Sequence, residues 1–184
     1  MPALPEPAPF WRFSLQLYRQ PGVADACIAL QDGCGVDVNL LLFLFWLAAG
    51  GRHLAADEVE KLDDQVRGWR NLTIIPIRDM RRQLKETRTL LVADRQEAFR
   101  AKVKAVELEA ERLQQEALYA ISRSGPLGKA ADPGAAVRGN VSAYERLIGA
   151  SFPESAIAVL LGAFNSVSHD GLGADLGLAA ATRG

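Results

Sequence analysis

The chain has 184 residues, of which 49% are hydrophobic and 23% charged, and its formal net charge is −1. This length and composition are typical of one folded domain that needs neither a disulfide framework nor a structural metal. The near-zero charge excludes a general attraction to nucleic acid or to an acidic membrane surface, so any such attraction has to be local.

Hydrophobic residues recur at three- and four-residue spacing in the first third of the chain and predict helices over residues 10–18, 21–33 and 38–49. Asp37 precedes the third helix as a candidate N-cap, because its carboxylate can accept hydrogen bonds from free amides of the first turn. The third helix is apolar on all sides, which predicts a buried helix. Since a membrane span needs about 20 apolar residues, we expect no membrane insertion.

The middle of the chain predicts three further helices. The first covers residues 56–69, and Thr73 is a candidate cap for the next, with Pro76 in its first turn. A long helix then extends to about residue 122, and the pattern leaves open whether it joins its predecessor near Thr87. The apolar stripe predicted for the long helix follows near-heptad spacing. This spacing is compatible with packing in the core of one chain or with pairing of two copies through residues 92–121. The members of the stripe are Phe99, Val103, Val106, Ala110, Leu113, Ala117 and Ile121.

The composition divides the chain into five segments. These are an irregular arm over 1–8, a helical core over 9–122, a flexible Gly/Ala-rich linker over 123–140, C-terminal helices over 141–167 and a mobile tail over 168–184. No convincing strand is found. The predicted fold is therefore a single all-α domain of six to eight helices with orthogonal, bundle-like packing.

Residues for catalysis or metal binding are sparse. Cys27 and Cys34 do not have zinc-ligand spacing, and the two histidines are far from them in sequence. No nucleophile, phosphate-loop or metalloprotease motif occurs. We therefore predict no catalytic residue, no metal and no cofactor. Reduced thiols in a protein without a secretion signal indicate a cytoplasmic location.

The segment before the buried helix is the first candidate site. Asp37 and Asn39 lie beside glycines at the entrance to the most apolar helix, where polar groups must find partners. One interpretation is a cap with a buried hydrogen-bond network, which would satisfy Asn39 internally. The other is a ligand site, which would leave Asn39 facing a cleft.

A basic segment is the second candidate. Between Arg67 and Lys104 there are eleven basic and four acidic residues, a local charge of +7. Guanidinium groups on a rigid helix suit carboxylate or phosphate recognition, because each can bind two oxygens at once. The alternative is that these side chains pair with acidic residues of neighbouring helices. The residues singled out are Trp69, Arg70, Arg78, Arg81, Arg82 and Lys85.

Several of these residues together resemble a conserved, uncharacterised family of small proteobacterial α-helical proteins, over roughly residues 8–120. The resemblance implies a helical, cytosolic protein and no particular activity. It is carried by Phe10-Trp11 with Phe13-Ser14 and Tyr18, Leu30-Gln31, Gly35 with Asp37-Val38-Asn39 and Leu40-Leu41-Leu42, Trp46, Trp69-Arg70, Pro76 with Arg78 and Arg81, and Leu84-Lys85.

Two functions are compatible with this sequence. The first is a non-catalytic adaptor whose face of Arg78, Arg81, Arg82 and Lys85 engages an acidic partner. The second is a binding protein or enzyme in which Asp37, Asn39, Trp69, Arg70 and Arg78 converge on an anionic small molecule. Nucleic acid is not expected, because no reader motif is present and Trp69, which precedes the arginine run, is expected in the core.

Overall fold

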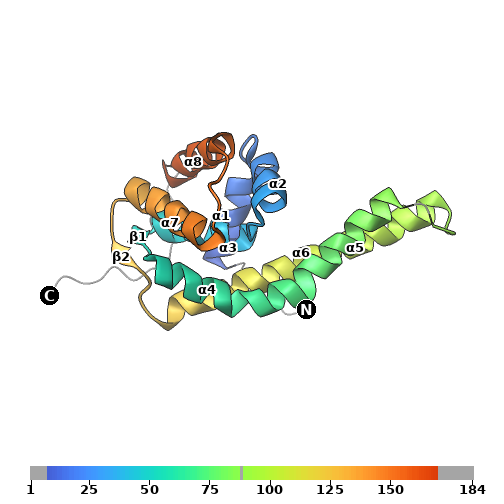
Figure 1. Cartoon of the computed structure of the whole chain (residues 1–184), viewed down its shortest axis with the longest axis horizontal. Coiled ribbons are helices and arrows are strands. Elements are labelled where there is room, and N and C mark those ends of the chain that lie inside the picture. The colour runs from blue at the N-terminus through green and yellow to red at the C-terminus, as the bar shows by residue number, and fades with distance from the viewer. Residues whose placement is uncertain (1–7, 88, 170–184) are drawn as a thin grey trace, which may run out of the picture.

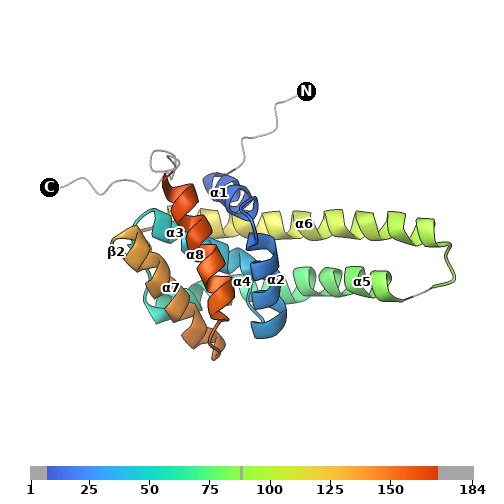
Figure 2. The same ribbon diagram turned by 90° about the horizontal axis from the view of Figure 1, so that it is seen from above.

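The computed structural model describes residues 8–87 and 89–169. Within them the chain forms eight α-helices, one π-helical segment and one pair of two-residue strands, so the predicted all-α single domain is confirmed (Figure 1). Helices α2, α7 and α8 cross the direction of α5 and α6 (Figure 2). No described helix combines the length and the apolar character that crossing a membrane requires. The elements are α1 Pro9–Tyr18, α2 Val23–Cys34, α3 Val38–Ala49, β1 Arg52–His53, α4 Ala56–Trp69, η1 Arg70–Ile74, α5 Ile75–Glu86, α6 Ala93–Ser124, β2 Lys129–Ala130, α7 Pro133–Ile148 and α8 Glu154–His169.

Helix α3 lies at the centre of the core, as its all-round apolar sequence predicts. Its residues from Asn39 to Ala48 are all buried. It packs against α1, α6 and α7, and its Trp46 ring stacks on Phe43 with 5.6 Å between ring centroids. Asp37 caps its first turn by accepting hydrogen bonds from the amides of Asn39 and Leu40. The predicted cap and the predicted buried helix are thus both present.

The chain stays helical from α4 through α5, although Thr73 was predicted to begin a separate helix. A π-helical turn, Arg70–Ile74, joins the two helices, and the amide of Ile75 donates to the carbonyl of Arg70, five residues earlier. Pro76 follows at once and cannot donate a backbone hydrogen bond. The wider turn accommodates the missing donor without a break, so the prediction of an N-cap at Thr73 is wrong.

Helices α5 and α6 form an antiparallel pair that projects from the body as an arm (Figures 1 and 2). Helix α5 ends at Glu86 and α6 begins at Ala93, which answers the question that the sequence left open near Thr87. The outer part of the arm packs only one helix against the other, whereas the last turns of α6 contact α1, α3 and α4. Helix α6 therefore belongs to both the arm and the body.

The predicted flexible linker over 123–140 is wrong in its second half, because α7 begins at Pro133. Asp132 caps this helix by accepting from the amide of Ala135 at 3.0 Å, and Pro133 occupies its first turn, where a missing N–H costs nothing. Asn140 is fully buried and bonds the backbone of Leu44, Arg52 and Leu54. An Asp-Pro start signal and a satisfied core asparagine thus outweigh the Gly/Ala composition. The predicted arm over 1–8 and tail over 168–184 fall almost entirely outside the described residues.

The core stripe predicted for α6 is partly wrong. Val103 and Ala110 are buried, but Phe99, Val106 and Leu113 are exposed. The helix is rotated because polar groups on α3 and α5 need partners, and the polar side chains of α6 supply them. The buried residues of α6 are Val103, Glu107, Ala110, Gln114, Gln115 and Leu118.

Candidate ligand site

Arg70 links two buried carboxylates where α3, α4 and η1 meet. Its Nη1 donates to Asp37 Oδ2 at 2.9 Å and to Asp63 Oδ1 at 2.7 Å. Burial by itself would raise the pKa of Asp63, but Arg70 and Arg67 together outweigh it and hold that pKa below its ordinary value. Because its Nη1 bridges both carboxylates, Arg70 ties the start of α3 to α4 and is not a free cation.

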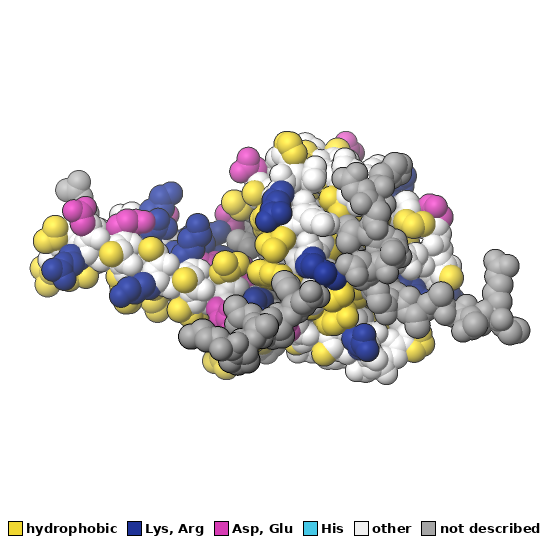
Figure 3. All heavy atoms as spheres, turned by 180° about the vertical axis from the view of Figure 1, so that it is seen from behind, with side chains coloured by type: hydrophobic (Ala, Val, Ile, Leu, Met, Phe, Trp, Pro, Cys, Tyr) yellow, Lys and Arg dark blue, Asp and Glu magenta, His cyan; other side chains and the backbone are white. Residues whose placement is uncertain are grey.

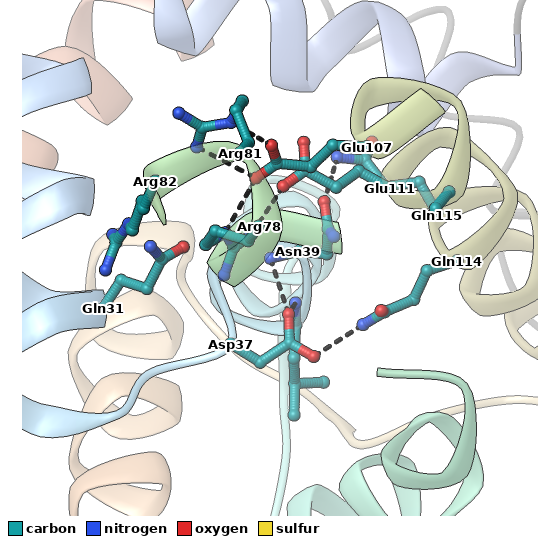
Figure 4. A network of polar contacts seen from close by, with 12 residues as sticks. Gln31, Asp37, Asn39, Arg78, Arg81, Arg82, Glu107, Glu111, Gln114 and Gln115 are labelled. Carbon is teal, nitrogen blue, oxygen red and sulfur yellow. Dashed lines mark hydrogen bonds and ion pairs between the residues drawn. The ribbon is translucent and has the colours of Figure 1, made fainter. Parts of the chain in front are cut away.

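Helix α6 supplies two amides to the start of α3. Gln114 Nε2 donates to Asp37 Oδ2 at 2.6 Å, and Gln115 Nε2 donates to Asn39 Oδ1 at 2.8 Å (Figure 4). The backbone amide of Asp37 donates to the hydroxyl of Tyr144 on α7 at 2.9 Å. This is the buried network that one interpretation of the sequence predicted for Asp37 and Asn39.

Arg78 and Arg81 of α5 point to Glu107 of α6 (Figure 4). Arg78 donates from Nε to Glu107 at 2.9 Å and from Nη2 to Glu111 at 2.6 Å, and Arg81 also bonds Glu107. Burial would raise the pKa of Glu107, but the two arginines outweigh it and hold that pKa below its usual range. Burial raises the pKa of Glu111 despite its single arginine, so its neutral form is favoured relative to an ordinary glutamate.

The remaining members of the predicted basic face are exposed. Arg82 pairs with Asp32 of α2 at 2.6 Å, and both side chains are about half in solvent. Lys85 makes no ion pair within the described part of the chain. Trp69 lies apart from this face and donates from its indole nitrogen to the carbonyl of Ala110 at 3.0 Å, which fixes η1 against α6.

Three cavities adjoin along the junction of α1, α2, α3, α5 and α6, and Gln31 lines all three. The outer groove, about 600 Å³, runs between α2 and the α5–α6 arm and is lined by Arg78, Arg81, Arg82 and Lys85. The middle cavity, about 380 Å³, brings Asn39, Arg70, Arg78 and Arg82 to one wall with Asp37. The inner pocket, about 220 Å³, lies between α1, α3 and α6. Its walls are Trp11, Ser14, Leu15, Tyr18, Gln31, Val38, Asn39, Leu42, Leu108, Glu111 and Gln115.

Two buried polar atoms of the inner pocket have no hydrogen-bond partner among the described residues. They are Ser14 Oγ on α1 and Gln115 Oε1 on α6, and both residues are more than nine-tenths buried. An unpaired buried donor or acceptor costs about 1–3 kcal/mol, so a ligand that satisfied these atoms would recover part of that cost. A mainly apolar pocket with a few unsatisfied polar atoms is a common arrangement for binding small molecules.

The structure thus brings Asp37, Asn39, Arg70, Arg78 and Arg82 together, while Arg81 and Lys85 line the outer groove and neither of the two cavities deeper in the body. Apart from Asn39, sequence reasoning did not assign the polar residues Ser14 and Gln115 to a site. Ser14 carried a signal, because it interrupts the apolar face formed by Phe10, Phe13 and Leu17. Gln115 carried none, because the predicted α6 stripe placed it on the outer surface, whereas Glu111 was expected as an acidic partner of the arginines, and Arg78 does pair with it.

The fold and site define an all-α domain with a projecting helical arm and a set of cavities where the arm joins the body. No group of three histidine, cysteine, aspartate or glutamate side chains within residues 8–87 and 89–169 is arranged to hold a metal ion.

The chain belongs to the family described as protein of unknown function DUF2390, which matches residues 9–118. This confirms the resemblance to an uncharacterised family, whereas the proteobacterial source stays a prediction. No curated protein and no solved structure gives a significant match. The matched region runs from α1 to the last turns of α6 and so includes every residue that lines the inner pocket.

Proposed function

We propose that this protein binds a small organic anion without transforming it. The apolar part of the ligand occupies the inner pocket, and its charged group lies in the outer groove near Arg82. The observation that carries the proposal is that the two spaces adjoin and share a wall. Gln31, Tyr18, Leu108 and Glu111 line both the apolar pocket and the arginine-lined groove.

The charges of the outer groove favour an anion. Five basic and four acidic side chains line the groove, and the raised pKa of Glu111 favours the neutral form of one of the acidic ones. Glu107 is already neutralised by Arg78 and Arg81. The cations that remain for a ligand are therefore Arg82, whose exposed pair with Asp32 contributes little, together with Lys85 and Lys104 on the same groove.

The inner pocket favours an apolar body with a hydrogen-bond donor. Leu15, Val38, Leu42 and Leu108 form most of its surface, and Trp11 adds an aromatic side. Gln115 Oε1 can only accept a hydrogen bond, whereas Ser14 can donate or accept. A carboxylate or phosphate ester whose apolar chain carries a hydroxyl or amide group matches these features.

Calorimetric titration of butanoate, hexanoate and octanoate into the full chain tests the proposal. Because burial of one methylene is worth about 0.8 kcal/mol, the dissociation constant should fall about fourfold per added methylene until the pocket is full. Arg82→Ala should weaken octanoate, and Leu108→Trp should obstruct the pocket. The matched control is Arg138→Ala on α7, because Arg138 is exposed and lines none of the three cavities. Affinity that does not depend on chain length, or equal loss in Arg82→Ala and Arg138→Ala, would refute the proposal.

An adaptor for an acidic protein partner is the second candidate. It is favoured by the open outer groove with Arg82, Lys85 and Lys104 on its walls. It is weakened by the engagement of Arg78 and Arg81 with Glu107. If Arg82→Glu with Lys85→Glu abolishes binding of an acidic peptide while octanoate does not compete with that peptide, the adaptor function is preferred.

A further inference from the structure

Helix α6 carries an exposed apolar stripe that the ligand site does not use. Phe99, Val106 and Leu113 are 50, 55 and 40% exposed, Ala120 continues the series in solvent, and Val92, 72% exposed, precedes it as the N-cap of α6. These five positions are spaced by seven residues throughout. Figure 3 shows hydrophobic side chains along the arm.

The stripe lies on a face that no described element covers. Helix α5 packs on the adjoining side of α6, the side that carries Val103 and Glu107, and Phe99 and Val106 lie about 40–60° around the helix from Val103. From Phe99 to Ala120 the stripe is about 32 Å long at 1.5 Å per residue. With one apolar position per heptad it is narrower than a coiled-coil seam, which has two, so the residues beside it must also take part in any pairing of helices.

The charges beside the stripe are arranged antisymmetrically about its middle. Three residues after successive stripe positions stand Arg95, Lys102, Glu109 and Glu116, all exposed. In a parallel pair of such helices like charges would lie side by side. In an antiparallel pair centred near Val106, the two basic residues lie beside the two acidic ones.

We propose that two copies of this chain associate through antiparallel pairing of their α6 helices, with the twofold axis near Val106. Phe99 packs against Leu113 of the partner subunit. Lys102 lies beside Glu109 of the partner subunit, and Arg95 beside Glu116 of the partner subunit. Within one copy, Arg112 pairs with Glu109 and Glu116. One guanidinium does not neutralise two carboxylates, so this half of the stripe's border stays negative.

This arrangement also brings each arm tip to the body of the other copy. Leu90 and Leu91, at the tip, are exposed by 106 and 57%, and antiparallel pairing places them near the last turns of the partner's α6. The interface is independent of the proposed ligand site. Leu108, which lines the inner pocket, projects about 160° around the helix from Val106.

The first experiment measures the mass of the full chain by light scattering over a range of concentrations, together with Val106→Glu. The chain should have twice the monomer mass at the higher concentrations, and Val106→Glu should be a monomer that keeps the helical circular-dichroism spectrum of the wild type. A monomeric wild-type chain at 100 μM, or a dimer that Val106→Glu leaves intact, overturns the proposal.

Oxidative cross-linking then tests orientation, with Cys34→Ser as the background. Val106→Cys should cross-link to itself, whereas Leu108→Cys, equally exposed at 54% on another side of the helix, should not. Phe99→Cys should cross-link only when mixed with Leu113→Cys. A Phe99→Cys chain that cross-links efficiently to itself indicates parallel pairing and overturns the proposal.

A charge exchange tests the contribution of the flanking residues. Lys102→Glu should weaken the dimer, and the double variant Lys102→Glu with Glu109→Lys should restore it, because the pairs are re-formed with reversed sign. If the double variant is as weak as the single one, the assigned register is wrong.

Discussion

Replacing Asp37 by alanine should destabilise the fold far more than the loss of one helix cap. Asp37 Oδ1 caps α3, while Oδ2 accepts from Arg70 Nη1 at 2.9 Å and from Gln114 Nε2 at 2.6 Å. The carboxylate is almost fully buried, so no solvent can replace these bonds. Arg70 keeps Asp63 as a partner, whereas the amide of Gln114 loses its acceptor.

The magnitude follows from these contacts. Loss of an N-cap costs about 1 kcal/mol. A buried amide donor without a partner costs about 1–3 kcal/mol. Together they predict a loss of about 3 kcal/mol in the free energy of unfolding, which for a protein of this size lowers the melting temperature by about 6–12 °C.

The assay is urea unfolding followed by circular dichroism at one fixed protein concentration, with two comparison variants. Asp132→Ala removes the exposed cap of α7 and no buried contact, so it should cost about 1 kcal/mol. Asp37→Ser keeps a capping oxygen and loses the contacts of Oδ2, so it should fall between the other two. Equal losses in Asp37→Ala and Asp132→Ala would refute the idea that the buried network contributes beyond the cap.

Three further outcomes are expected. Glu107→Gln should lower the free energy of unfolding by about 3 kcal/mol, because it breaks a buried ion pair. Glu111→Gln, one turn away, should leave that free energy unchanged or raise it, because burial raises the pKa of Glu111. Urea unfolding at pH 7 compares the two variants, and equal losses would contradict the assignment. The pKa values of Asp63 and Glu107 lie below their ordinary values. The stabilisation of the folded state by these two carboxylates is therefore complete above about pH 4 and declines as the pH falls through their folded-state pKa values. The urea midpoint should fall from pH 7 through pH 5 to pH 3, and a midpoint that rises on acidification would contradict this reasoning. Burial raises the pKa of Cys27 to about 11. A thiol reagent at pH 8 should therefore label the less buried Cys34 first and react with Cys27 only when the chain is unfolded in urea. Rapid labelling of both thiols in the folded chain would argue against burial of Cys27.

Local patterns were sufficient where a single segment decides its own structure. The apolar run from Val38 to Ala49 could only be a buried helix, and Asp37 could be recognised as its cap. The same reasoning failed at residues 133–140, where composition suggested flexibility and a buried Asn140 instead fixes the helix to the core. It failed at Thr73 because a π-helical turn adjusts the register around Pro76.

The candidate site divides in the same way. Asp37 and Asn39 could be selected from the sequence because polar groups beside an apolar helix need partners, and Arg70 and Arg78 because they belong to a basic segment. Which partners they find could not, because Gln114 and Gln115 lie more than seventy residues away and on a face that periodicity assigned to solvent. The inner pocket with Ser14 follows from the same unpredicted rotation of α6.

The sequence by itself determined the helical class, the central helix and its cap, because helix propensity, periodicity and capping depend on neighbours within a few residues. Only the tertiary structure decided which face of α6 is buried. That choice rests on satisfying buried polar groups of α3 and α5, and it leaves the apolar stripe through Val106 facing solvent. Hydrogen-bond satisfaction between distant segments therefore fixed both surfaces on which our proposals rest, the ligand pocket and the face for a second copy.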